Sequence, residues 1–242
     1  MQTIFSHPKS LRDISTHYCP GCGHGLAHRL IAEVIDEFGI REKVIAVAPV
    51  GCAVIAYDYW DFDCCEAAHG RALAVATAIK RVRPQNIVFT YQGDGDLAAI
   101  GTNETIHAAN RGENLTAIFI NNAIYGMTGG QMAPTTLVAQ KTATTPFGRD
   151  VKDHGHPFKI SEMLALLPAV KYVERTALDS PQGVLKSKQA IKQAFQNQLD
   201  NAGFSLVEIL SACQTYWGMS PEASLKWIKE VMNKYFPLGR IK

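Results

Sequence analysis

Apolar residues recur three or four positions apart in several segments of the chain. Between residues 26 and 39 this spacing groups six of them on one side of a helix: Leu26, Leu30, Ile31, Val34, Ile35 and Phe38. Gly39 follows, and glycine is frequent just past a helix end. Similar patterns predict further helices within residues 69–84, 100–112, 182–203 and 220–236. Ser220 and Pro221 suit the first turn of the last of these helices.

Short and nearly continuous apolar runs alternate with these helices. They predict buried strands within residues 43–52, 86–96, 115–126, 170–177 and 204–213. Regular alternation of strands and helices is typical of an α/β fold with a doubly wound, mostly parallel sheet. No repeat or linker interrupts the pattern, so residues 1–242 are expected to form a single domain. Residues 125–156 show no period, and a loop longer than about 12–15 residues is usually functional or mobile.

Composition narrows the class of protein. The chain has 242 residues, 47% hydrophobic and 19% charged, with a net charge of +2, which favours neither nucleic acid nor a membrane surface as a partner. The opening MQTIFSHPKS lacks a charged region followed by a long apolar core, so no signal peptide is expected. No apolar run approaches the roughly 20 residues of a membrane span. We therefore expect a cytoplasmic protein.

Residues able to bind a ligand follow the predicted strands. Cys52, the GDGD turn at residues 93–96, the pair Asn121–Asn122 and Cys213 all stand where a strand ends, which is where open parallel sheets bind ligands. Glycines at 93 and 95 allow the backbone to approach a phosphate closely. Carboxylate and amide oxygens suit Mg²⁺, which could bridge them to a diphosphate.

The spacing of these residues resembles the thiamine diphosphate signature. In that signature a GDG triplet precedes an Asn pair, here by the 25 residues from 96 to 120. The resemblance implies that Asp94, the side chain of Asn122 and the backbone carbonyl of Ile124 bind Mg²⁺. The alternative is that GDGD is a plain turn and the Asn pair a surface loop, because such dipeptides are common in turns.

Six cysteines stand at positions 19, 22, 52, 64, 65 and 213. In a reducing compartment such a set indicates metal binding or catalysis more often than disulfides. The stretch HYCPGCGHG, at residues 17–25, is by itself compatible with zinc, a disulfide, a catalytic thiol or an iron–sulfur cluster. His24 within it could lie near a cofactor or cap a helix.

Five motifs in order resemble the β subunit of 2-oxoacid:ferredoxin oxidoreductases over nearly the whole chain: YCPGCGHG, GC at 51–52, HGRA at 69–72, GDGD and NNAIYGMTGGQMAPTT. The resemblance implies a [4Fe–4S] cluster held by Cys19, Cys22, Cys52 and Cys213. A Cys₄ zinc site uses the same ligands and is the main alternative. Cys64 and Cys65 match no ligand position. The resemblance also implies a thiamine diphosphate site formed by Gly51, Cys52, His69, Gly93, Asp94, Gly95, Asp96, Asn122, Ile124, Tyr125 and Thr128.

The reaction implied is a CoA-dependent oxidative decarboxylation of a 2-oxoacid, with electrons passing through the cluster to ferredoxin. The chain has room for the diphosphate-binding half only, so the activating glutamate is expected on an α-type subunit; γ and ferredoxin-like δ subunits could complete the complex. The apolar segment 53–55 favours a branched-chain 2-oxoacid over 2-oxoglutarate. Two alternatives remain: a subunit of a non-oxidative thiamine diphosphate-dependent decarboxylase, and a zinc-stabilised binding module without catalysis.

Overall fold

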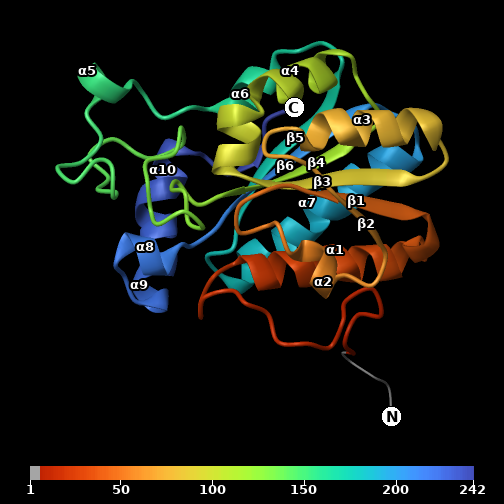
Figure 1. Ribbon diagram of the computed structural model, residues 1–242, viewed down its shortest axis with the longest axis horizontal. Coiled ribbons are helices and arrows are strands. Elements are labelled where there is room, and N and C mark those ends of the chain that lie inside the picture. Colours follow the sequence, from red (N-terminus) through yellow and green to blue (C-terminus); the bar gives the residue numbers. More distant parts are fainter. Residues whose placement is uncertain (1–5) are drawn as a thin grey trace.

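A seven-stranded sheet runs through the molecule in the order β2-β1-β3-β4-β6-β5-β7 (Figure 1). The computed structural model describes residues 6–242, so the first residues of the stretch considered for a signal peptide lie outside it. The strands are β1 (Val44–Ala48), β2 (Asp63–Glu66), β3 (Ile87–Gly93), β4 (Thr116–Asn121), β5 (Val170–Ala177), β6 (Phe204–Leu210) and β7 (Gly239–Arg240). Neighbouring strands are parallel except β5 and β7. The predicted doubly wound, mostly parallel α/β fold is confirmed.

Helices cover both faces of the sheet, as parallel crossover connections require. One face packs against α1 (His24–Phe38) and α7 (Pro181–Leu199), and the other against α3 (Ala72–Val82), α4 (Thr102–Asn110) and α6 (Ile160–Ala165) (Figure 1). The shorter helices are α2 (Ala56–Tyr59), α5 (Val151–His154), α8 (Gln214–Trp217), α9 (Pro221–Trp227) and α10 (Asn233–Tyr235). Within residues 6–242, no helix combines the length and the apolar character needed to cross a membrane.

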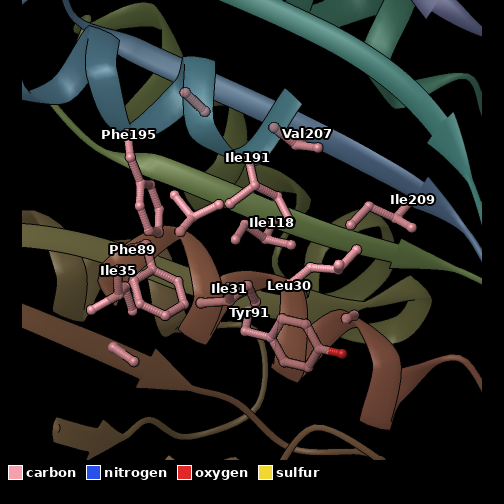
Figure 2. Close-up of a cluster of buried hydrophobic side chains, with 14 of the residues drawn as sticks. Leu30, Ile31, Ile35, Phe89, Tyr91, Ile118, Ile191, Phe195, Val207 and Ile209 are labelled. Carbon is pink, nitrogen blue, oxygen red and sulfur yellow. The ribbon is translucent and has the colours of Figure 1, made fainter. Parts of the chain in front are cut away.

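The largest apolar cluster lies between the sheet and the helices α1 and α7 (Figure 2). The helical face predicted from the spacing of Leu30, Ile31 and Ile35 is the face that α1 buries there. It meets Ile191 and Phe195 from α7 and the strand residues Phe89, Ile118, Val207 and Ile209. Full burial of each such side chain contributes roughly 1.5–3 kcal/mol, so this cluster fixes α1 against the sheet.

Several elements differ from the sequence expectations. The helix expected over 69–84 begins only at Ala72, and the helix expected over 100–112 is preceded by a π-helical turn, Asp96–Ile100. The helix expected over 220–236 is divided into α9, a π-helical segment (Ile228–Met232) and α10. Ser220 caps α9 as predicted, since its hydroxyl accepts from the Ala223 N–H. The strands β2 and β7 were not predicted, because they are short edge strands without an apolar run.

The connection after β4 has an internal anchor in the buried Arg149. Its guanidinium donates to the backbone carbonyls of six residues: Ala133, Pro134, Thr136, His154, Gly155 and His156. One side chain therefore joins both ends of the irregular segment 133–156 and adds to its local turn hydrogen bonds. His154 and His156 are exposed in this segment.

The substitution Arg149→Met should lower the free energy of unfolding by about 3–5 kcal/mol, because two buried and four partly buried carbonyls lose their donor at once. Urea unfolding followed by circular dichroism measures this loss. Arg83→Met is the matched control, since Arg83 is exposed at the end of α3 and its replacement should cost less than about 0.5 kcal/mol. Equal losses in the two variants would contradict the anchoring role of Arg149.

Candidate functional site

Four loops meet at the carboxyl edge of the sheet because β1, β3, β4 and β6 are consecutive neighbours there. The strand order reverses between β1 and β3, the position where doubly wound sheets bind ligands. The cavity at this point is lined by nearly all residues predicted to contact the cofactor: Gly51, Cys52, His69, Gly93, Asp94, Gly95, Asp96, Asn122, Ile124 and Tyr125. Thr128 is not among its lining residues; its hydroxyl donates to the Gln131 side chain.

Three oxygen-bearing groups converge at the floor of this cavity. The end of the Asn122 amide lies 2.7 Å from both the Asp94 Oδ2 and the Ile124 carbonyl oxygen. With its nitrogen on that side, the amide donates to both; with its oxygen there, three oxygens face one another. Mg²⁺ binds oxygens at about 2.1 Å, which puts neighbouring ligands roughly 3 Å apart. The donor set and its spacing therefore fit Mg²⁺.

Asp94 is held from two sides and is almost fully buried. Its Oδ2 accepts from the Asn122 backbone N–H at 3.1 Å, and its Oδ1 accepts from the Thr135 hydroxyl. Burial raises the pKa of Asp94 to about 7, although these hydrogen bonds act in the opposite direction. A bound divalent cation would favour the ionised carboxylate that burial disfavours.

Asp96 serves a different purpose from Asp94. Its buried carboxylate accepts from the His69 Nδ1 at 2.8 Å and from the Gly70 backbone N–H at 2.7 Å, and the Gln92 amide donates to it as well. Because Nδ1 is used in this way, Nε2 is the ring atom of His69 left for a ligand. Asp96 thus fixes the turn before α3 that carries His69 into the cavity wall.

Gly95, the second glycine of the GDG triplet, lies close to two side chains of the cavity wall. A Cβ on Gly95 would lie 3.1 Å from the Tyr125 ring and 3.6 Å from the His69 Cε1. The backbone here is covered by two side chains that both line the cavity. A Cβ at position 95 would require the Tyr125 ring to shift by a few tenths of an ångström, whereas the distance to His69 is an ordinary contact, so glycine leaves the Tyr125 ring its place in the cavity wall.

A second cavity, of about 160 Å³, adjoins the first and is lined by the four predicted cluster cysteines: Cys19, Cys22, Cys52 and Cys213. His24, Cys52, Asn122 and Gly126 line both cavities. A Cβ on Gly126 would stand 3.3 Å from the sulfurs of both Cys52 and Cys213, so the absence of a side chain leaves this space open. The ring of His24 shares a 2.7 Å hydrogen bond with the Tyr91 hydroxyl, which holds it in the common wall.

Contacts between the two ends of the chain bring the cysteines together. The Cys22 N–H donates to the Cys19 carbonyl at 2.9 Å, which closes a tight turn before α1. The Gln214 side chain donates to the Pro20 carbonyl inside that turn. Since Gln214 directly follows Cys213, this bond joins the first cysteine pair to the last cysteine.

Burial raises the pKa of three of the thiols that line this second cavity. It raises the pKa of Cys22 to about 11 and of Cys213 to about 12, and it also raises the pKa of Cys52. The neighbouring cysteines add to each of these shifts by mutual repulsion of their thiolates. Four thiolates side by side therefore need a cationic group among them, and a cluster with four iron atoms fits that requirement.

Cys64 and Cys65 lie apart from both cavities. They belong to the edge strand β2, and Cys64 packs partly against the main apolar cluster. The sequence motifs indicate no role for Thr135, although it lies in the stretch NNAIYGMTGGQMAPTT. They also leave out Trp217, whose Nε1 donates to the Asn122 carbonyl at 3.1 Å. No local pattern in the sequence marks either contact.

Comparisons with known proteins identify the family of this chain. Residues 50–209 match the family described as thiamine pyrophosphate enzyme, C-terminal TPP binding domain. The ketoisovalerate oxidoreductase subunit VorA of Methanothermobacter thermautotrophicus is 48% identical over 97% of this chain and 51% of its own length. The 2-oxoglutarate synthase subunit KorB of Archaeoglobus fulgidus is 39% identical over 90% of this chain and 77% of its own.

A solved structure extends the likeness to three dimensions. The 2-oxoglutarate:ferredoxin oxidoreductase from Magnetococcus marinus, with 2-oxoglutarate, coenzyme A and succinyl-CoA bound, matches with a TM-score of 0.76 and 28% identity, over 88% of this chain and 69% of that one. The chain spans about half the length of the ketoisovalerate relatives it matches. By sequence and by fold, the chain belongs to the family of thiamine pyrophosphate-binding β subunits of 2-oxoacid:ferredoxin oxidoreductases.

Proposed function

We propose that this chain is the β subunit of a 2-oxoacid:ferredoxin oxidoreductase that carries thiamine diphosphate, Mg²⁺ and a [4Fe–4S] cluster. The observation that carries the proposal is the common wall of the two cavities, formed by His24, Cys52, Asn122 and Gly126. An electron acceptor in one cavity would lie directly beside a cofactor in the other. When bound, thiamine diphosphate supplies the carbanion stabilisation that decarboxylation of a 2-oxoacid needs.

The residues of the first cavity hold and orient that cofactor. Asp94, Asn122 and the Ile124 carbonyl would bind the Mg²⁺, and the metal would hold the diphosphate at the sheet edge. His69, fixed through Nδ1 by Asp96, lines the same cavity, and its other ring nitrogen would serve a ligand there. Hydrogen bonds within the chain fix Asp94 and His69, so these groups would position the cofactor with little rearrangement.

Three glutamates in the first half of the chain, Glu33, Glu66 and Glu104, lie away from both cavities. Glu33 pairs with Lys188 at 2.6 Å, and Glu104 pairs with Arg71 at 2.6 Å. Glu66 is exposed at the end of the edge strand β2. None of the three is among the residues lining either cavity. This supports an α-type partner subunit as the source of the activating glutamate. In the proposed reaction, γ or ferredoxin-like δ subunits and ferredoxin receive the electrons, and CoA receives the acyl group.

The cavity wall supports a substrate with an apolar side chain. Val50 and Ala53, on either side of the Gly51–Cys52 pair, both line the first cavity. A branched-chain 2-oxoacid would place its alkyl group against such a wall, whereas 2-oxoglutarate would require a partner for a second carboxylate. The relatives named ketoisovalerate oxidoreductase subunits are also more similar to this chain than those named 2-oxoglutarate synthase subunits.

The two alternatives explain only part of the site. A subunit of a non-oxidative decarboxylase would use the first cavity but leaves the four thiols without a purpose. A zinc-stabilised binding module would need the thiolates within about 2.3 Å of one point. It would also leave Asp94, Asn122 and the Ile124 carbonyl in the adjoining cavity without a purpose, whereas a redox cluster gives both cavities a role in one reaction.

An anaerobic absorption spectrum with metal analysis tests the proposal. The chain purified without air should show a broad visible band that bleaches on reduction, and should contain about four iron atoms. A colourless chain containing zinc would contradict the cluster. Turnover of a 2-oxoacid by the isolated chain, without any partner subunit, would contradict the proposed division of the active site.

A further inference from the structure

A buried chain of charged and polar side chains lies behind the candidate metal site. At its centre is Glu208 on β6, which is 1% exposed. Its Oε1 accepts from the Asn121 amide Nδ2 at 2.7 Å, and its Oε2 accepts from the Arg175 Nε at 2.8 Å. The Ser161 hydroxyl also donates to Oε2. Nothing in the proposed reaction uses Glu208 or Arg175 directly.

The outer end of this chain is an ion pair. Arg175 donates with both terminal nitrogens to Glu162, at 2.8 and 2.6 Å, and also to the Pro237 carbonyl at 3.1 Å. Its side chain is 1% exposed. The Arg175–Glu208 pair is buried on both sides, and buried ion pairs are weak sources of stability, since apolar side chains of similar volume often replace them without loss. A role in fixing geometry explains their presence here better than stability does.

The inner end of the chain reaches the backbone between two candidate metal ligands. Asn121 uses its Oδ1 to accept from the Ala123 N–H at 3.1 Å. Ala123 has a φ of 57°, in the left-handed region that residues with a Cβ seldom adopt. This residue separates Asn122 from Ile124, so its conformation decides where both of them point. The Ala123 carbonyl is held in turn by the Thr136 hydroxyl at 2.7 Å.

We infer that Glu208 and Asn121 are positioning residues for the metal site. Glu208 orients the Asn121 amide, which holds Ala123 in its left-handed conformation and so aims the Asn122 side chain and the Ile124 carbonyl at one ion. The inference rests on the proposed Mg²⁺ site. It also assigns a purpose to the first asparagine of the pair, whose side chain points away from the metal ligands toward Glu208.

Exchanging the amide of Asn121 and the carboxylate of Glu208 tests this inference. In Asn121→Asp a carboxylate faces the Glu208 carboxylate, and in Glu208→Gln the single amide cannot satisfy Asn121, Arg175 and Ser161 together. The double variant Asn121→Asp/Glu208→Gln restores the pairing, because the introduced amide would donate to the introduced carboxylate while the amide oxygen accepts from Arg175.

The measurement is the Kd of the Mn²⁺–thiamine diphosphate complex for the full chain, by titration calorimetry. Each single variant should raise it about tenfold or more, and the double variant should return it to near the original value.

Urea unfolding of the same proteins separates positioning from general destabilisation. Where a charged variant does not fold, Asn121→Ala serves instead, since it leaves the Glu208–Arg175 pair intact. It should lower the unfolding midpoint, because one buried Glu208 oxygen loses its donor, and it should still raise the Kd about tenfold when binding is measured where the variant is fully folded. Single variants that bind as tightly as the original chain, or a double variant as weak as the singles, would overturn the positioning role alone. An original chain that does not bind Mn²⁺–thiamine diphosphate would instead overturn the proposed metal site and, with it, this inference.

Discussion

Replacing Asp94 by asparagine is expected to raise the Kd for magnesium and thiamine diphosphate by at least about 100-fold. The substitution removes the only charge among the three candidate metal ligands. Both Asp94 oxygens already accept hydrogen bonds, one from Thr135 and one from the Asn122 N–H. An amide at this position either turns its NH₂ toward the Asn122 N–H, which opposes a donor, or turns it toward the Thr135 hydroxyl, which must then accept and give up its present bond. The loss therefore combines a weaker ligand with a disturbed turn, whereas changes behind a metal site alone typically cost 10–100-fold.

The same substitution two residues along the chain is the control for Asp94→Asn. Asp96 lines the same cavity, but its carboxylate is used by His69 and the Gly70 N–H and not by the metal oxygens. Asp96→Asn should weaken thiamine diphosphate binding by about tenfold and leave Mn²⁺ affinity nearly unchanged. Titration calorimetry with each ligand distinguishes the two effects. Equal losses of Mn²⁺ affinity in both variants would show that neither carboxylate has the assigned role.

The fold could be predicted where the sequence signal is local. The apolar face of α1 and the buried parallel strands repeat with fixed periods, and these periods reflect burial directly. The edge strand β2 has no such signal, because Asp63 and Glu66 at its ends face solvent and its pairing with β1 supplies the order. The π-helical turn Asp96–Ile100 also has no local signature, since it forms where Gly101 packs against Gly70.

The candidate site likewise contains residues whose proximity could be predicted from the sequence and contacts that could not. The spacing from Asp94 to Asn122 could be read from the sequence because one helix and one strand connect them, which brings both to neighbouring strand ends. The contact of Thr135 with Asp94 depends on the path of a long irregular connection, and Arg149 determines that path through six carbonyls. The pairing of Asn121 with Glu208 joins residues 87 positions apart. Such contacts follow from the packed structure, and no short motif contains them.

Replacing Cys213 by alanine is expected to abolish the iron–sulfur cluster. The thiol is one of four around the second cavity, and a [4Fe–4S] cluster uses four thiolates. Iron content should fall from about four atoms per chain to nearly none, with loss of the visible absorption band. Cys64→Ala is the matched control, because Cys64 lies in the edge strand β2 and lines neither cavity. Its iron content should be that of the original chain, and a comparable loss would contradict the ligand assignment.

The position of Cys52 allows a sharper test of the two-cavity arrangement. Cys213 lines only the second cavity, whereas Cys52 lines both. Cys213→Ala should therefore lose iron and keep thiamine diphosphate affinity within about threefold, while Cys52→Ala should lose iron and also weaken thiamine diphosphate binding by about tenfold. The Asp94→Asn variant should show the opposite loss, keeping its iron without binding the cofactor. If all three variants lost both groups together, the two cavities would have to form one cooperative site, and the separate assignment of their residues would be wrong.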